Sequence, residues 1–192
     1  MMRAAVLIVG VTLVIGLAYA WLNSARAARP TVGQEAPAFR LQDQDGNWLE
    51  LGDLRGSWVA VYFYPKADTP GCTKEACEFR DNIFAFKEIG ARVIGVSIDA
   101  IRDQKAFAEK YSLPFPLLAD IEGKTAEAYG VLRNLGVMKI ASRQSFLIAP
   151  DGKIAKHYEK VDPKTHSKEV LADLKALGAS EPARLPRDLA GE

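Results

Sequence analysis

Alternation of apolar and polar residues predicts two hairpins, one near each end of the region that follows residue 30. Their arms are residues 39–41, 48–51, 143–149 and 154–159. The arms flank an Asp-Gly pair, Asp45-Gly46 in the first hairpin and Asp151-Gly152 in the second. Asp-Gly between alternating segments favours a tight turn, because glycine adopts positive φ without steric cost.

Between the hairpins, buried strands alternate with helices. Strands are predicted at residues 58–64, 92–98 and 116–119, and helices at residues 73–89, 103–111, 125–129 and 166–177. The run Trp58–Tyr64 is apolar throughout, as expected for a strand covered on both faces. Ala76, Phe79 and Ile83 recur at helical spacing, and Gly90 ends that helix. The pattern predicts an α/β fold with a mixed central sheet flanked by helices and preceded by an N-terminal hairpin.

The first thirty residues have a different character. Residues 4–22 are uncharged and almost wholly apolar, which is long enough to cross a bilayer. Trp21 at the boundary favours an uncleaved anchor, and we expect such an anchor to lie in the bacterial inner membrane. The alternative is a signal segment cleaved after Ala18-Tyr19-Ala20, with export to the periplasm.

These patterns divide the chain into three parts. Residues 1–30 form the predicted anchor or signal segment, residues 31–179 the α/β domain, and residues 180–192 a flexible tail with two prolines and no periodicity. The length of the middle part suits one ordinary domain with its own core.

Charge and composition exclude several kinds of partner. Lys and Arg number 25 against 24 Asp and Glu, so the net charge of +1 offers no field that would attract nucleic acid. Two cysteines are too few for a disulfide framework, and with only two histidines a closed zinc site is not supported. We therefore expect no metal or cofactor, and we place His157 and His166 at the surface or at a helix cap.

The two cysteines, Cys72 and Cys77, lie just after the strand predicted at 58–64. Cys72 falls where that strand turns into the helix predicted from Thr73. A thiolate is favoured at a helix N-terminus, where unpaired N–H groups and the macrodipole attract an anion. The position predicts a redox site built around a reactive thiolate.

The segment Tyr62–Cys77, with sequence YFYPKADTPGCTKEAC, resembles the active-site segment of peroxiredoxins of the bacterioferritin-comigratory (PrxQ) branch. It contains the family pattern Pro-x-x-x-Thr-x-x-Cys as Pro65, Thr69 and Cys72. The resemblance implies a thioredoxin-like fold and the reduction of hydroperoxides with thiol equivalents from a thioredoxin-like donor. It also implies that Cys72 attacks the peroxide and becomes a sulfenic acid.

A second matching stretch begins at Arg143, and the resemblance extends over roughly residues 32–177. It implies that Arg143 holds the thiolate and the peroxide, whereas spacing alone reads it as a solvated arginine at a strand end. Glu75 is a weaker candidate for orienting that arginine. The Thr69 hydroxyl either caps the helix by accepting from the Cys72 N–H or donates to the thiolate or the peroxide. Pro65 either shields the thiolate from water or only ends the strand.

Cys77 presents a geometric problem. Five residues along an α-helix separate the two Cα atoms by about 8.5 Å. A disulfide needs less than about 7 Å, so the helix has to unwind before Cys72 and Cys77 join. The resemblance supports a resolving role for Cys77. The alternative is a small core residue, with a thiol from another molecule resolving Cys72.

Two other classes of protein predict a different spacing of the cysteines. A membrane-tethered thiol–disulfide oxidoreductase predicts Cys-x-x-Cys, and a copper-delivery protein predicts Cys-x-x-x-Cys with a nearby histidine. Four residues separate the cysteines of this chain, and Thr69 precedes the first by three positions. The pattern therefore favours a peroxidase, which we expect to be a monomer.

Overall fold

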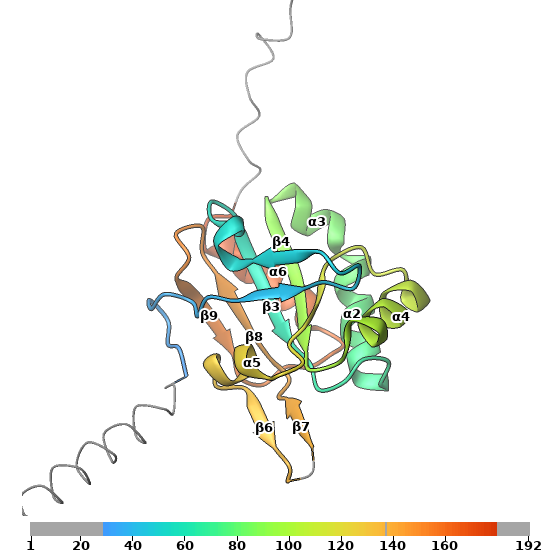
Figure 1. Ribbon diagram of the computed structural model, residues 1–192. Helices are drawn as coiled ribbons and strands as arrows, with labels where there is room; N and C mark the ends of the chain where they lie inside the picture. The colour runs from blue at the N-terminus through green and yellow to red at the C-terminus, as the bar shows by residue number, and fades with distance from the viewer. Residues whose placement is uncertain (1–28, 137, 180–192) are drawn as a thin grey trace, which may run out of the picture.

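A seven-stranded mixed sheet forms the centre of the protein in the computed structural model, which describes residues 29–136 and 138–179 (Figure 1). Its strands in spatial order are β2 (Trp48–Glu50), β1 (Arg40–Gln42), β5 (Leu117–Ala119), β4 (Ala91–Ser97), β3 (Trp58–Phe63), β8 (Gln144–Ile148) and β9 (Ile154–Tyr158). Strands β3, β4 and β5 pair in parallel, and all other neighbours pair antiparallel. Both predicted hairpins and the mixed sheet are confirmed.

Helices cover both faces of the sheet. One face packs against α2 (Pro70–Asp81), α3 (Ile83–Glu88), α4 (Ile101–Tyr111) and α6 (His166–Ala176). The other face packs against the 3-10 helix η1 (Leu51–Leu54) and α5 (Lys124–Ala128). Side chains of β3 alternate between these layers: Tyr62 contacts the first cluster through Phe79, and Phe63 contacts the second through Tyr129. This double burial is why the strand reads as an uninterrupted apolar run.

The helix predicted at residues 73–89 differs from the prediction in two respects, so its predicted bounds are wrong. It begins earlier, at Pro70, because proline suits the first helical turn, where an N–H has no partner in any case. It is also broken at Asn82, whose ψ of 5° ends α2 and starts α3. The Asn82 side chain donates to the Glu78 carbonyl at 2.8 Å, which occupies an acceptor at the end of α2.

A short two-stranded sheet was not predicted. It consists of β6 (Leu132–Asn134) and β7 (Lys139–Ala141), which pair antiparallel and project from the body of the molecule (Figure 1). Strand β7 is followed within two residues by Arg143, so this hairpin delivers the chain to the start of β8.

The predicted N-terminal segment, apart from Arg29 and Pro30, and the predicted C-terminal tail lie outside the described residues. Within 29–136 and 138–179, no helix has the length and apolar character needed to cross a membrane.

Candidate active site

Cys72 lies in the first turn of α2, close to the carboxyl end of β3. Thr69 is the N-cap, so Cys72 is the third helical residue rather than part of the preceding turn. Its side chain is only 1% exposed and belongs to the apolar cluster that contains Tyr62 and Ala76. The sulfur therefore sits at the positive end of a helix and is largely shielded from solvent.

The loop between β3 and α2 is held by polar side chains that follow β4 and end α4. The Ala67 N–H donates to Asp99 Oδ2 at 2.7 Å. Asp68 has a left-handed backbone, with φ of 57°, and its carboxylate accepts from Lys110 Nζ and the Tyr111 hydroxyl, both at 2.7 Å. These bonds fix the path of the chain into α2. Sequence analysis missed them because their partners are distant along the chain.

Arg143 joins α2 to the sheet. Its Nη2 donates to Cys72 Sγ at 3.2 Å, and its Nη1 donates to Glu75 Oε2. Gly71 permits this approach, because a Cβ at that position would lie 3.0 Å from Arg143 Nη2. The structure therefore brings together Cys72, Glu75 and Arg143, in the arrangement expected if Arg143 holds the sulfur and Glu75 orients Arg143.

Glu75 is a buried carboxyl group with 0% exposure. Burial raises its pKa to about 7, although the charge and hydrogen bond of Arg143 act in the opposite direction. Its Oε1 has no hydrogen-bond partner among the described residues. The same environment affects Arg143: burial favours its neutral form, but Glu75 and Cys72 outweigh this and raise its pKa above the ordinary value. Arg143 thus stays cationic beside the sulfur.

Thr69 and Pro65 occupy the loop that leads to Cys72. The expected side-chain cap by Thr69 is not made, and its hydroxyl donates to the Lys66 carbonyl at 2.9 Å. The Thr69 carbonyl accepts the first helical bond, from the Thr73 N–H at 2.8 Å. Pro65 is half-buried at the turn after β3. The oxygen of the Thr69 hydroxyl keeps acceptor capacity because a hydroxyl has two lone pairs.

Cys77 lies on the same unbroken helix as Cys72. Both thiols are free, and Cys77 is half-buried. An intact α-helix keeps Cα atoms at this spacing about 8.5 Å apart, beyond disulfide range. The structure is therefore the conformation that precedes any bond between them.

The predicted surface or cap placement of the two histidines is wrong for His166, which is 0% exposed. Its Nε2 is 2.8 Å from Ser145 Oγ, and its ring meets Phe79 edge-on with centroids 5.6 Å apart. Burial, with Arg143 nearby, lowers its pKa to about 4. His157 is half-buried and stacks on Phe146 at 4.4 Å. Both rings pack against core aromatics, which explains their presence without a chemical role.

A thiol, a cationic guanidinium and a buried carboxyl group at the end of a parallel strand define a thiol enzyme of the α/β class. Comparison with known proteins is consistent with this class. Residues 32–157 match the model of the AhpC/TSA family. Peroxiredoxin Bcp of Bacillus subtilis is 43% identical over 150 residues, which cover 76% of this chain and 96% of the relative. Chloroplastic peroxiredoxin Q of Populus jackii is 42% identical over 151 residues, 78% of this chain and 70% of the relative.

Solved structures agree. Peroxidoxin BcpB from Mycobacterium tuberculosis superposes with a TM-score of 0.73 at 37% identity, covering 78% of this chain and 99% of that chain. The bacterioferritin comigratory protein of Xanthomonas campestris gives a TM-score of 0.70 at 32% identity, covering 77% and 99%. The chain therefore belongs to the AhpC/TSA family, within its peroxiredoxin Bcp/PrxQ group. It has the thioredoxin-like fold and is a thiol-dependent peroxidase that acts on hydroperoxides.

Proposed function

We propose that Cys72 is the peroxidatic nucleophile and that Arg143 is its principal partner in catalysis. The observation that carries the proposal is the 3.2 Å contact between Arg143 Nη2 and Cys72 Sγ. A guanidinium is charged at any working pH and offers several donors in a fixed plane. It stabilises negative charge on sulfur before the reaction and on oxygen as the peroxide bond breaks.

The proposed chemistry is a displacement at oxygen. The Cys72 thiolate attacks one peroxide oxygen, the O–O bond breaks, and the other oxygen leaves as alkoxide or hydroxide and takes up a proton. Sulfur loses two electrons and becomes a sulfenic acid, while the hydroperoxide is reduced to an alcohol or water. Thr69 and Pro65 are assigned to the substrate side of the site, Thr69 as a hydroxyl that contacts the peroxide and Pro65 as a cover against water.

Cys77 is assigned to resolution of the sulfenic acid. Its thiol displaces water from Cys72, and an intramolecular disulfide forms. The first turns of α2 have to unwind for this step, which exposes Cys72 and Ala76 and separates Glu75 from Arg143. Phe79, one turn further on, stacks on Tyr62 with centroids 4.8 Å apart. It anchors the rest of the helix to the sheet, so the unwinding stays local.

The substrates and the electron donor are part of the proposal. The Xanthomonas campestris bacterioferritin comigratory protein is described as having alkyl peroxide reduction activity. We assign organic hydroperoxides as well as hydrogen peroxide to this chain. A thioredoxin-like dithiol then returns two electrons to the disulfide by thiol–disulfide exchange. We propose that the protein works as a monomer, since Cys72 and its resolving thiol belong to one chain.

The N-terminal segment is proposed to locate the enzyme. Residues 4–22 would hold residues 31–179 at the bacterial inner membrane as an uncleaved anchor, with residues 180–192 as a tail. The apolar length and Trp21 support an anchor over an exported, cleaved form. Intact mass of the protein recovered from membranes tests this: a chain that lacks the first twenty residues would rule out the anchor.

Mass mapping after peroxide treatment tests the assignment of the two cysteines. One equivalent of hydrogen peroxide is added to the reduced full chain, which is then alkylated and digested. We expect a Cys72–Cys77 disulfide in the wild type and a dimedone-reactive sulfenic acid on Cys72 in the Cys77→Ser variant. Persistent sulfenic acid in the wild type, with Cys77 alkylated, would remove the resolving role. Modification of Cys77 with Cys72 untouched would overturn the nucleophile assignment.

A further inference from the structure

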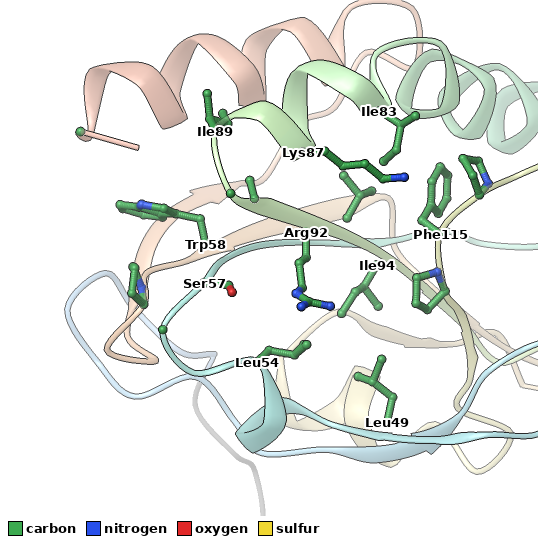
Figure 2. A pocket seen from close by; sticks show the side chains of 18 residues that line it. Leu49, Leu54, Ser57, Trp58, Ile83, Lys87, Ile89, Arg92, Ile94 and Phe115 are labelled. Carbon is green, nitrogen blue, oxygen red and sulfur yellow. The ribbon is translucent and has the colours of Figure 1, made fainter. Parts of the chain in front are cut away.

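A cavity of about 650 Å³ lies at the end of the sheet opposite Cys72. Its walls are the amino-terminal ends of β3 and β4, helix α3, and the segment before β5 (Figure 2). Trp58 lines it at the start of β3, whereas Cys72 follows the other end of that strand. At about 3.3 Å per residue, the five steps from Trp58 to Phe63 make β3 about 17 Å long, and Cys72 lies beyond its far end. The cavity is therefore distinct from the active site, and its volume lies within the range of about 300–1,000 Å³ found for small-ligand sites.

The cavity has apolar walls from both layers of the fold. Ile83 and Phe115 contribute from the layer of α3, and Leu49, Leu54 and Ile94 contribute from the opposite layer (Figure 2). Both layers reach it because the sheet has a gap at this corner. The ladder between β4 and β5 begins only at Gly95, so the first residues of β4 have β3 on one side and no strand on the other.

Two cations extend over these walls. Lys87 comes from α3, and Arg92 points from β4 toward the side formed by Leu54 (Figure 2). Both side chains are exposed, and neither has an ion-pair partner in the part of the chain that the structure describes. Among the described residues that line the cavity, none is acidic. The charge of the cavity lining therefore favours an anionic ligand.

The open edge of β4 adds a backbone donor. The Gly95 N–H points across this edge and donates to the Pro116 carbonyl at 3.0 Å. Because backbone N–H groups alternate between the two edges of a strand, the Val93 N–H points to the same edge, two residues before the β4–β5 ladder. A peptide added as a strand would have to stop there, since Pro116 already occupies the next position. So short an edge suits one small polar group rather than an extended peptide.

We propose that this cavity binds a small amphipathic carboxylate, that is, an aliphatic or aromatic acid with one anionic group and an apolar body. The Arg92 guanidinium, with its forked donors, anchors the carboxylate. Lys87 adds positive charge, and the apolar body lies against Ile83, Ile94 and Phe115. Trp58 at the rim gives the site its own spectroscopic probe.

Octanoate and 1-octanol test the proposal, because they share the apolar body and differ in charge. The full chain is titrated with each while tryptophan fluorescence is followed, and a Trp58→Phe variant identifies the signal from the cavity. We expect octanoate to bind at least tenfold more tightly than octanol. Arg92→Gln should weaken octanoate about tenfold and Lys87→Gln about threefold, with octanol unchanged. Arg102→Gln, an exposed arginine on α4 outside the cavity, is the matched control and should change neither.

Several results would overturn the proposal. The proposal fails if octanoate and octanol bind with equal affinity, or if the double variant Lys87→Gln/Arg92→Gln leaves the affinity for octanoate unchanged. It also fails if octanoate shows no saturable binding. Tighter octanoate binding in a Leu185→Asp/Leu189→Asp variant would assign the cavity to residues 180–192 instead. A dimer in sedimentation velocity that the double variant abolishes would assign it to a second copy of the chain. Peroxide consumption by the same variants should match the wild type, so this test is independent of the peroxidase chemistry.

Discussion

The guanidinium of Arg143 contacts the sulfur of Cys72 at 3.2 Å, although the two residues are 71 positions apart in the chain. The contact depends on the antiparallel pairing of β8 with β3, which places the start of β8 beside the end of β3. Nη1 of the same guanidinium reaches Glu75. One side chain thus links the reactive thiol, the first turns of α2 and the sheet.

The two-pronged contact of Arg143 predicts the effect of Arg143→Lys. An ammonium is a single point of charge and cannot span Cys72 and Glu75 as the planar fork does. We expect the second-order rate of peroxide reaction to fall about 10²-fold, the loss typical of removing one donor that stabilises developing charge. Stopped-flow fluorescence measures this rate. Arg133→Lys is the control, since Arg133 donates to Ser142 and Arg143 is the arginine that donates to Cys72 and Glu75; similar losses in both variants would contradict the assignment.

The buried carboxyl group of Glu75 predicts a pH-dependent change in stability. Its pKa in the folded protein is about 7, above the ordinary 4.5, because burial favours the protonated form. The contribution of Glu75 to the free energy of unfolding is therefore complete below about pH 4.5 and is lost as pH rises through 7. The free energy of unfolding of Glu75→Gln, compared with that of the wild type, should therefore increase from pH 5 to pH 8.5, by at most about 3 kcal/mol. Urea unfolding at the two pH values checks this, with the exposed Glu109→Gln as control. A gain that does not change with pH would be the contrary result.

The buried ring of His166 predicts the opposite dependence of stability on pH. Burial lowers its pKa from 6.5 to about 4, so the folded protein favours the neutral ring. Stability from this group is present above pH 6.5 and is lost as pH falls toward 4, by about 3 kcal/mol at most. Between pH 7 and pH 4.5 the wild type should lose more stability than His166→Gln, as measured by urea unfolding. His157→Gln, at a half-buried ring, should behave nearly as the wild type; equal acid sensitivity in all three proteins would contradict the prediction.

Tyr62 and Tyr64 form a matched pair of buried tyrosines. The Tyr62 hydroxyl has no hydrogen-bond partner among the described residues, whereas the Tyr64 hydroxyl donates to Gln104. An unpaired buried hydroxyl costs about 1–3 kcal/mol, so Tyr62→Phe should raise the free energy of unfolding by about 1 kcal/mol. Tyr64→Phe should lower it by a similar amount, because Gln104 loses its donor. Chemical denaturation of both variants measures the difference, and a loss in Tyr62→Phe would point to a partner for that hydroxyl.

Much of the fold is predictable from the sequence because its elements have strong local signals. The apolar run of β3 and the two Asp-Gly turns fix the order of the central elements. The break at Asn82 is not visible in the pattern, since Ile83 and Phe86 continue the helical spacing across it. The β6–β7 hairpin was missed for the opposite reason: residues 132–141 lack the alternation that a half-buried strand shows.

The active site, like the fold, is predictable from the sequence only in part. Cys72, Thr69 and Pro65 are close in sequence and carry a recognisable motif, so the resemblance identifies them. The contact between Arg143 and Glu75 depends on strand pairing and burial, which no local pattern encodes. The side-chain cap expected of Thr69 is not formed: the hydroxyl donates to the Lys66 carbonyl inside the same turn, and no N–H of α2 donates to its oxygen.

Single-turnover peroxide consumption by the full chain tests most directly whether Cys72 is the reacting thiol. Reduced wild type, Cys72→Ser and Cys77→Ser are each mixed with excess hydrogen peroxide without an external thiol. Cys77→Ser should consume peroxide at the wild-type initial rate and yield sulfenic acid at Cys72, and Cys72→Ser should consume none. If Cys72→Ser consumed peroxide as fast as the wild type, the reacting sulfur would have to be elsewhere.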